Sequence, residues 1–175
     1  DLWKYDDGKH QWFNILPVMN TAVPPARNRH AMALLGSRVV LLFGGASTKL
    51  KTLETGKYFN DTWMYNDHTQ MWLLVPDKPN MLLPEAREYH AMAGLENQKA
   101  IMFGGLNEQN INLKDTWRFD GNTREWMEVS ATGISTPTAR YFHSMASTGG
   151  GTVVLHGGKL SAAKFKDDTW KYDDN

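Results

Sequence analysis

One short motif recurs four times in the chain and limits its possible folds more than any other feature. Each copy begins with Asp, carries a tryptophan two residues later and an aromatic residue two residues after that, and ends with Asp or Asn. The four tryptophans lie 60, 54 and 53 residues apart, at Trp3, Trp63, Trp117 and Trp170. A second tryptophan follows nine residues after each of the first three, at Trp12, Trp72 and Trp126. Repeats of this length predict similar supersecondary units that pack on their neighbours and share a continuous core.

Two further motifs occupy fixed positions between the tryptophan motifs. An Ala-Arg-x-x-His segment occurs three times, and 13 residues after each histidine begins a triplet that ends in Gly-Gly. The arginines and histidines are Arg27, His30, Arg87, His90, Arg140 and His143, and the triplets begin at Phe43, Phe103 and His156. Because the three motifs keep the same order, the repeat extends over nearly the whole chain.

Each repeat has the pattern of four short strands. Residues 32–35 and 39–43 form the arms of a hairpin, and the second arm is apolar at every position, which is typical of a strand buried on both faces. In the third strand Trp63 and Tyr65 alternate with other residues, so both rings project to one face and can pack against the neighbouring unit. Asx and glycine residues before the fourth strand predict tight turns. Helix signals are absent.

In this order the motifs resemble the kelch repeat, especially the form found in galactose-oxidase-like propellers. The resemblance covers essentially all 175 residues. It implies an all-β fold, a kelch-type β-propeller with about three four-stranded antiparallel blades.

The repeat spacing also predicts where each blade begins and ends. We expect strands three and four of a first blade at 1–17, a second blade at 26–76, a third at 86–130, and strands one to three of a fourth at 139–175. Known propellers need at least about four blades to close. The chain should therefore be part of a larger closed propeller, with the remaining blades from a longer chain or from a second copy. In a two-copy ring the extra third strand would have to be displaced.

Composition narrows the classes of function. Nineteen basic and nineteen acidic residues cancel, so no overall field attracts the chain to nucleic acid or to an anionic membrane, and no apolar segment is long enough for direct membrane insertion. The absence of cysteine excludes disulfides, thiolate metal sites and the cysteine-linked tyrosine chemistry of galactose oxidase. We expect no cofactor. The compartment stays open, with a soluble cytoplasmic protein favoured over a secreted one.

The Arg-x-x-His segments supply the candidates for chemistry. Resemblance to kelch domains places their strand innermost, so that Arg27, His30, Arg87, His90, Arg140 and His143 would lie near the channel mouth. Three imidazoles could bind a transition metal, but equivalent positions on successive blades lie along an arc and do not converge, so we assign neither a metal site nor a catalytic residue. The guanidinium groups suit carboxylate or phosphate recognition, and the alternative is an interblade hydrogen bond to a carbonyl or an Asx side chain.

Loop lengths point to the face that carries function. In antiparallel blades the loops from strand two to three and from four to one share a face, and spacing varies only in these loops. They form a locally basic, aromatic-bearing rim that suits an acidic partner. The partner-binding candidates are Lys49, Lys51, Tyr58, Phe59, Lys164 and Phe165.

These observations favour a non-enzymatic protein-binding or scaffold module. One alternative is a propeller enzyme or lectin acting on sugars or sugar acids, similar to kelch-type mutarotases, with Arg and His as anion clamp and acid/base groups. Another is a structural subunit of a large assembly.

Overall fold

The computed structural model describes residues 1–47, 56–130 and 136–174, and in these residues all regular structure is β-strand. Four antiparallel sheets follow one another in chain order, and we call them the first to fourth sheets; a further two-stranded sheet forms a separate hairpin in the described residues. No helix in the described ranges is long and apolar enough to cross a membrane. The expectation of an all-β fold is therefore confirmed.

The second and third sheets each contain the four strands expected of a blade. The first sheet is β1 (Leu2–Asp6) and β2 (Gln11–Ile15). The second is β3 (Ala31–Leu34), β4 (Val39–Phe43), β5 (Thr62–Asn66) and β6 (Met71–Val75). The third is β8 (Ala91–Gly94), β9 (Lys99–Asn107), β10 (Asn112–Asp120) and β11 (Glu125–Glu128), with the short β7 (Arg87–Glu88) paired to the end of β9. The fourth is β12 (Ser144–Gly149), β13 (Thr152–His156) and β16 (Thr169–Asp173).

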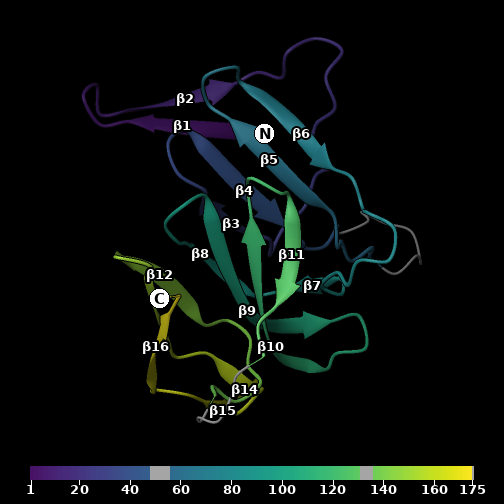
Figure 1. Cartoon of the computed structure of the whole chain (residues 1–175), viewed down its shortest axis with the longest axis vertical. Helices are drawn as coiled ribbons and strands as arrows, with labels where there is room; N and C mark the ends of the chain where they lie inside the picture. Colours follow the sequence, from purple (N-terminus) through teal and green to yellow (C-terminus); the bar gives the residue numbers. More distant parts are fainter. Residues whose placement is uncertain (48–55, 131–135, 175) are drawn as a thin grey trace.

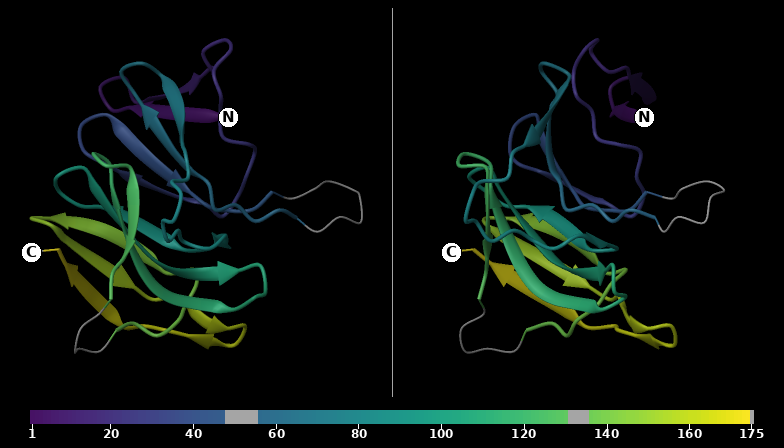
Figure 2. Two further views of the ribbon diagram at one scale, coloured as in Figure 1. Left: turned by 45° about the vertical axis from the view of Figure 1, so that its right-hand side comes forward. Right: turned by 90° about the vertical axis from the view of Figure 1, so that its right-hand side faces the viewer.

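The four sheets are arranged in chain order from one end of the molecule to the other. The first sheet lies at one end of the molecule and the fourth at the other, with the two termini far apart (Figure 1). Turning the molecule shows the second, third and fourth sheets packed face to face (Figure 2). The arrangement is that of consecutive propeller blades along an arc.

In the third and fourth sheets the segments between strands two and three contain paired strands. In the third sheet β9 and β10 continue past Gly104 and Gly105, and a register shift between Leu113 and Thr116 marks an irregularity in the ladder. The corresponding loop of the fourth sheet forms a separate hairpin of β14 (Lys159–Ser161) and β15 (Lys164–Phe165). These segments are thus hairpins that extend the strands beyond the glycine pair, where backbone pairing holds their side chains in place.

The core lies between sheets. One cluster joins the second and third sheets, and its buried members include Leu41, Phe43, Met102, Trp117 and Phe119. A smaller cluster joins the third and fourth sheets. In the second and third sheets this confirms the expectation that the apolar second strands are covered on two faces, because Leu41, Phe43, Ile101 and Met102 are 0%, 0%, 0% and 0% exposed.

Candidate functional site

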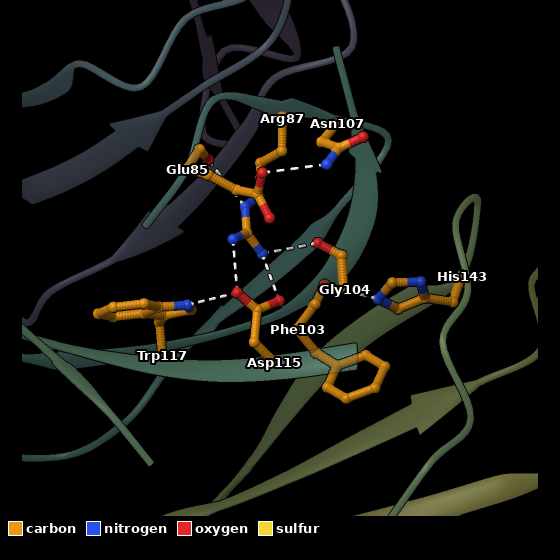
Figure 3. A network of polar contacts seen from close by, with 8 residues as sticks. All are labelled: Glu85, Arg87, Phe103, Gly104, Asn107, Asp115, Trp117 and His143. Atoms are coloured by element: carbon orange, nitrogen blue, oxygen red, sulfur yellow. Dashed lines mark hydrogen bonds and ion pairs between the residues drawn. The ribbon is translucent and has the colours of Figure 1, made fainter. Parts of the chain in front are cut away.

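The conserved spacing of Arg, Asp and Trp in each repeat builds one polar network, shown for the third sheet in Figure 3. The guanidinium of Arg87 donates to both carboxylate oxygens of Asp115, at 2.8 and 2.6 Å, and to the carbonyl of Gly104 at 3.0 Å. The indole Nε1 of Trp117 donates to the same carboxylate at 2.6 Å. The motif aspartate therefore orients both the arginine and the tryptophan of its own blade.

The same network occurs in the second and fourth sheets. Arg27 makes two hydrogen bonds to Asp61, and Trp63 donates to the same carboxylate. Arg140 and Trp170 make the equivalent contacts to Asp168. The bond from each arginine to a Gly-Gly carbonyl is also repeated, from Arg27 to Gly44 and from Arg140 to Gly157.

Burial and hydrogen bonding together fix the charge state of these pairs. Arg87 and Arg140 are fully buried, so each needs an anionic partner to offset the loss of hydration. Burial alone would raise the pKa of Asp115, but the hydrogen bonds from Arg87 and Trp117 hold it below its ordinary value. Hydrogen bonding to Arg140 lowers the pKa of Asp168 in the same way. The guanidinium groups are thus bound to carboxylates of this chain, and that geometry leaves them no free fork for a ligand.

Two of the three motif histidines, His90 and His143, lie between neighbouring sheets. His90 packs edge-on against Phe43 of the preceding sheet, and His143 packs in the same way against Phe103, with its Nε2 3.1 Å from the carbonyl oxygen of Phe103. Burial, reinforced by Arg140, lowers the pKa of His143 to about 4, and burial holds the pKa of His90 well below its ordinary value. Among the described residues no group of three His, Cys, Asp or Glu side chains could hold a metal ion.

The Gly-Gly pairs allow the next blade to cross closely. A Cβ on Gly44 would lie 2.7 Å from the carbonyl oxygen of Arg87, and one on Gly104 would lie 2.7 Å from that of Arg140. Both glycines also have positive φ, at 65° and 60°, where other residues are strained. The Arg-x-x-His and Gly-Gly motifs thus form one joint between consecutive sheets.

A partly exposed group of side chains lies beside these joints. Arg29, Tyr89 and Phe142 each precede the motif histidine, and their backbones are linked in series, because Tyr89 N donates to Arg29 O and Phe142 N donates to Tyr89 O, both at 3.1 Å. Their φ angles are 59°, 57° and 59°. Positive φ is unusual for bulky residues, and such strain often accompanies function.

Neighbouring aromatic and cationic groups extend this row. The rings of Tyr89 and Phe142 have centroids 3.9 Å apart, and Arg29 lies over Tyr89 at 4.8 Å. Lys159 lies over Phe142 at 5.5 Å and over Phe165 at 4.8 Å. We call the aromatic–cation cluster the set Arg29, Tyr58, Glu88, Tyr89, Tyr141, Phe142, Lys159 and Phe165.

The carboxylate of this cluster, that of Glu88, already has hydrogen-bond partners within the chain. Glu88 is buried and accepts hydrogen bonds from Arg29 at 2.8 Å and from Tyr58 at 3.1 Å. Phe142 and Phe165, by contrast, are 51% and 65% exposed. The exposed part of the cluster is therefore aromatic and cationic.

The residues predicted to bind a partner differ in their exposure to solvent. Tyr58, Lys164 and Phe165 lie in the loops between strands two and three, and the latter two are exposed. Phe59 is only 6% exposed, because its ring lies under Arg27 at 4.1 Å and its backbone bonds to Gly45. Phe59 therefore packs inside the blade and does not contribute to the rim. Lys49 and Lys51 lie outside the described residues.

Sequence reasoning missed the row of Arg29, Tyr89 and Phe142. These positions vary in residue type, so no motif marks them, and only their fixed place before the motif histidine could have drawn attention to them. Their backbone pairing across sheets is not visible in a one-dimensional pattern. The two kinds of loop do meet on one face, since Tyr141 and Lys159 form a backbone bridge, as do Asn28 and Ala46.

The sheets, the repeated Arg-Asp-Trp network and the interblade joints define a kelch-repeat β-propeller. The model of the KLHDC2/KLHL20/DRC7 Kelch-repeats domain matches residues 1–175, and the chain belongs to this family. It is 32% identical over 169 residues to Kelch domain-containing protein 10 of Xenopus tropicalis and of Homo sapiens, and 27% identical over 171 residues to Kelch domain-containing protein 1 of Mus musculus. Each match covers 95% of this chain but only 36 to 38% of the relative, so the chain spans less than two fifths of these proteins.

The fold is shared with a more distant solved structure. The structure of YjhT superposes with a TM-score of 0.68 at 19% identity, over 93% of this chain and 53% of the other. At that identity the likeness concerns the fold alone.

Proposed function

We propose that the chain is a protein-binding module that holds its partner on the aromatic–cation cluster. The observation that carries the proposal is the row of Arg29, Tyr89 and Phe142, in which backbone bonds across three sheets hold bulky residues at positive φ. Arg29 and Phe142 are exposed and Tyr89 is half-buried. Kelch domains generally bind protein partners. A surface with aromatic anchors and a cation is the composition that dominates binding energy in protein interfaces.

The charge of the cluster supports an acidic segment as the preferred partner. Within the cluster Lys159 brings positive charge and Glu88 is paired internally with Arg29 and Tyr58, and Lys164, which precedes Phe165 in the chain, adds a second positive charge beside the cluster. The ammonium group of Lys159 lies close to two exposed rings, those of Phe142 and Phe165. An extended segment with a carboxylate between two apolar side chains would match this arrangement, because the ammonium would bind the carboxylate and the rings would cover the apolar groups.

The proposal is tested by selecting displayed peptides on the wild-type chain and measuring their affinity for a triple variant, Lys159→Ala, Phe142→Ala and Phe165→Ala. We expect the selected peptides to be rich in Asp, Glu and apolar residues, and to bind the variant at least about tenfold more weakly, since loss of two aromatic anchors and a cation removes more than about 1.4 kcal/mol. Arg29 is left intact because its removal would leave the buried Glu88 carboxylate with less compensation.

A matched control uses a similar cation–ring pair elsewhere. Lys9 lies over the ring of Phe13 at 5.3 Å on the first sheet, and Met127 on β11 is 50% exposed. The variant Lys9→Ala, Phe13→Ala and Met127→Ala should bind the peptides with unchanged affinity. Equal affinity of both variants would refute the cluster as the binding surface. Enrichment of no peptide, together with binding to immobilised sugar acids, would favour the enzyme or lectin alternative.

A further inference from the structure

The outer edge of the second sheet differs in composition from the outer edges of the first and third sheets. Among the described residues β2, β6 and β11 each pair with one strand, so each forms the outer edge of its sheet (Figure 1). β2 contains Gln11 and Asn14, and β11 contains Glu125 and Glu128. In contrast, every residue of β6 is apolar. Of these three edges, the one in the middle therefore has no polar side chain.

Several side chains of β6 are also exposed. Met71, Leu73 and Leu74 are 41%, 42% and 46% exposed, while Val75 is buried in the core between the second and third sheets. Outer edge strands of folded proteins usually carry charged side chains or proline, which discourage another strand from pairing with them. β6 carries neither within its bounds. It therefore combines unpaired backbone groups with an exposed apolar surface.

The residues at both ends of β6 limit the length over which another strand can pair with it. Gln70, directly before β6, has a φ of 55°, which lies outside the extended region. Pro76, directly after β6, has no N–H to donate to a neighbouring strand. An added strand can therefore pair with the 5 residues of β6, of which Leu73 is the central one.

The backbone of this edge is symmetric about Leu73. Hydrogen-bonded and non-hydrogen-bonded pairs alternate in an antiparallel ladder, so every second residue of β6 turns its N–H and C=O away from β5. These residues are either Met71, Leu73 and Val75 or Trp72 and Leu74. Each set maps onto itself when the strand is reversed about Leu73. Two copies of β6 that pair antiparallel about this residue therefore bring outward-facing groups opposite one another along the whole strand.

The side chains of two copies also match in this register. Leu73 lies opposite Leu73 of the other copy, and on the opposite face Trp72 lies opposite Leu74, so that apolar groups meet on both faces. No charged residue is brought against a like charge. Self-pairing of β11 would instead bring Glu125 and Glu128 of both copies to one shared edge, where like charges repel.

We propose that β6 is a self-association surface, at which two copies of the protein pair antiparallel about Leu73 across a two-fold axis. The two second sheets then form one continuous sheet, and the exposed side chains of β6 in each copy are covered. A second copy fits this edge because the edge is self-complementary, as a two-fold interface requires, and has no charge that selects a charged segment. This surface is separate from the aromatic–cation cluster, none of whose residues lies on β6.

The test is sedimentation equilibrium of the full-length protein over a wide range of concentration. We expect a reversible dimer in the wild type. Leu73→Lys should weaken association at least about tenfold, because apolar contact is lost and two ammonium groups meet on the axis. The matched control is Met127→Lys, since Met127 is 50% exposed and, like Leu73, directly follows the second tryptophan of its repeat. This control should leave association unchanged.

A charge exchange separates pairing of two copies from a general effect of substitutions on β6. Leu73→Glu alone should weaken association as Leu73→Lys does. An equimolar mixture of the two variant proteins should form a dimer with one copy of each, because opposite charges then meet on the axis. Since Leu73 is 42% exposed, both charged side chains can reach water in the monomer, and thermal unfolding of each variant checks that it is folded.

Hydrogen exchange of the wild type gives a readout that needs no variant. Exchange of the β6 amides should slow as the protein concentration rises, while exchange of the β11 amides should not change. A monomer at every concentration would overturn the proposal, as would a dimer that Leu73→Lys leaves intact. A mixture of the charged variants that stays monomeric would assign β6 to a different partner. Protection of β6 that does not depend on concentration would assign this edge to another segment of the same protein.

Discussion

The interface between the second and third sheets and the interface between the third and fourth sheets have the same inner part but different outer parts. In both, a motif histidine packs on a phenylalanine of the preceding sheet, and a Gly-Gly pair lies under the incoming backbone. Further out, Trp126 closes the first interface, while the second holds a cavity of about 360 Å³. The largest difference between these two interfaces, in the described residues, is therefore the tryptophan that the fourth strand β11 contributes to the first of them.

The repeat motifs have two structural roles: some residues join consecutive sheets, and others close the outer part of the interface between them. The Arg, His and Gly positions join consecutive sheets and depend only on strands one to three, which both interfaces contain. The tryptophans close the outer part, and their burial depends on a neighbour. Trp126 is 4% exposed, whereas Trp12, at the same place in the first sheet, is 64% exposed. The same motif tryptophan therefore occurs in successive sheets, but it adds to stability only where a neighbouring sheet covers it.

The largest expected effect tests this dependence with two equivalent tryptophans. Trp117→Ala should cost about 3–5 kcal/mol of unfolding free energy, since a large side chain is removed from a closed interface. Trp170→Ala should cost about 1–2 kcal/mol, because the Trp170 ring borders the open cavity and is already partly solvated. Urea denaturation of both variants measures the difference.

Both tryptophans donate to the motif aspartate, at 2.6 and 2.8 Å, so the lost hydrogen bond is common to the two variants. Equal losses of stability would show that the aspartate bond, and not coverage by the neighbouring sheet, sets the contribution of these rings.

A smaller loss of stability is expected from substitutions in the inner part of the interfaces, where both contain a Gly-Gly pair under the incoming backbone. Gly104 and Gly150 have φ of 60° and 59°, but a Cβ on Gly104 would lie 2.7 Å from the carbonyl of Arg140, while one on Gly150 would meet nothing within 4 Å. Gly150→Ala should cost about 1–2 kcal/mol from backbone strain alone. Gly104→Ala should cost a further 1–3 kcal/mol or so, because the incoming backbone must move.

Thermal unfolding of the two glycine variants gives this comparison directly. A similar shift in both would mean that the joint between the third and fourth sheets is loose enough to accommodate a methyl group, and that its inner part is no tighter than a hairpin tip.

The sequence predicted the framework because the framework repeats. Trp117, the Gly-Gly pairs and the apolar second strands each recur at fixed spacing, so the four-stranded pattern and the kelch family could be inferred from residues alone, and both are confirmed. Exposure of the tryptophans could not be inferred, since it depends on which sheets lie beside them.

The loops were harder to predict for a physical reason. The segments after Gly-Gly pair as hairpins through backbone bonds, which carry little sequence signal. Phe59 looked like a rim residue, yet it packs under Arg27. The useful signal was its position two residues before the motif aspartate, where Leu113 is also buried. Arg29, Tyr89 and Phe142 differ in type and were therefore invisible to a search for repeats.

The smallest expected effect is a dependence of stability on pH. It tests whether water is excluded from the inner part of the interface between the third and fourth sheets. Burial lowers the pKa of His143 to about 4, well below the ordinary 6.5 that the unfolded chain would show. The unfolded state therefore takes up a proton as the pH falls below about 6.5, while folded His143 stays neutral, so stability is lost with falling pH until the pH approaches the folded pKa.

Between pH 7 and pH 5.5 this linkage should remove about 1 kcal/mol of unfolding free energy through His143. The window lies above the range in which the arginine-paired aspartates titrate, since the pKa values of Asp61, Asp115 and Asp168 are lowered. Urea denaturation at the two pH values, repeated with His143→Gln, measures the contribution. The variant is less stable at pH 7 because it disturbs packing on Phe103, but its pH dependence should be smaller by that amount. An unchanged dependence would mean that water reaches His143 in the folded state, and that the joint between the third and fourth sheets is open along its inner part as well as its outer part.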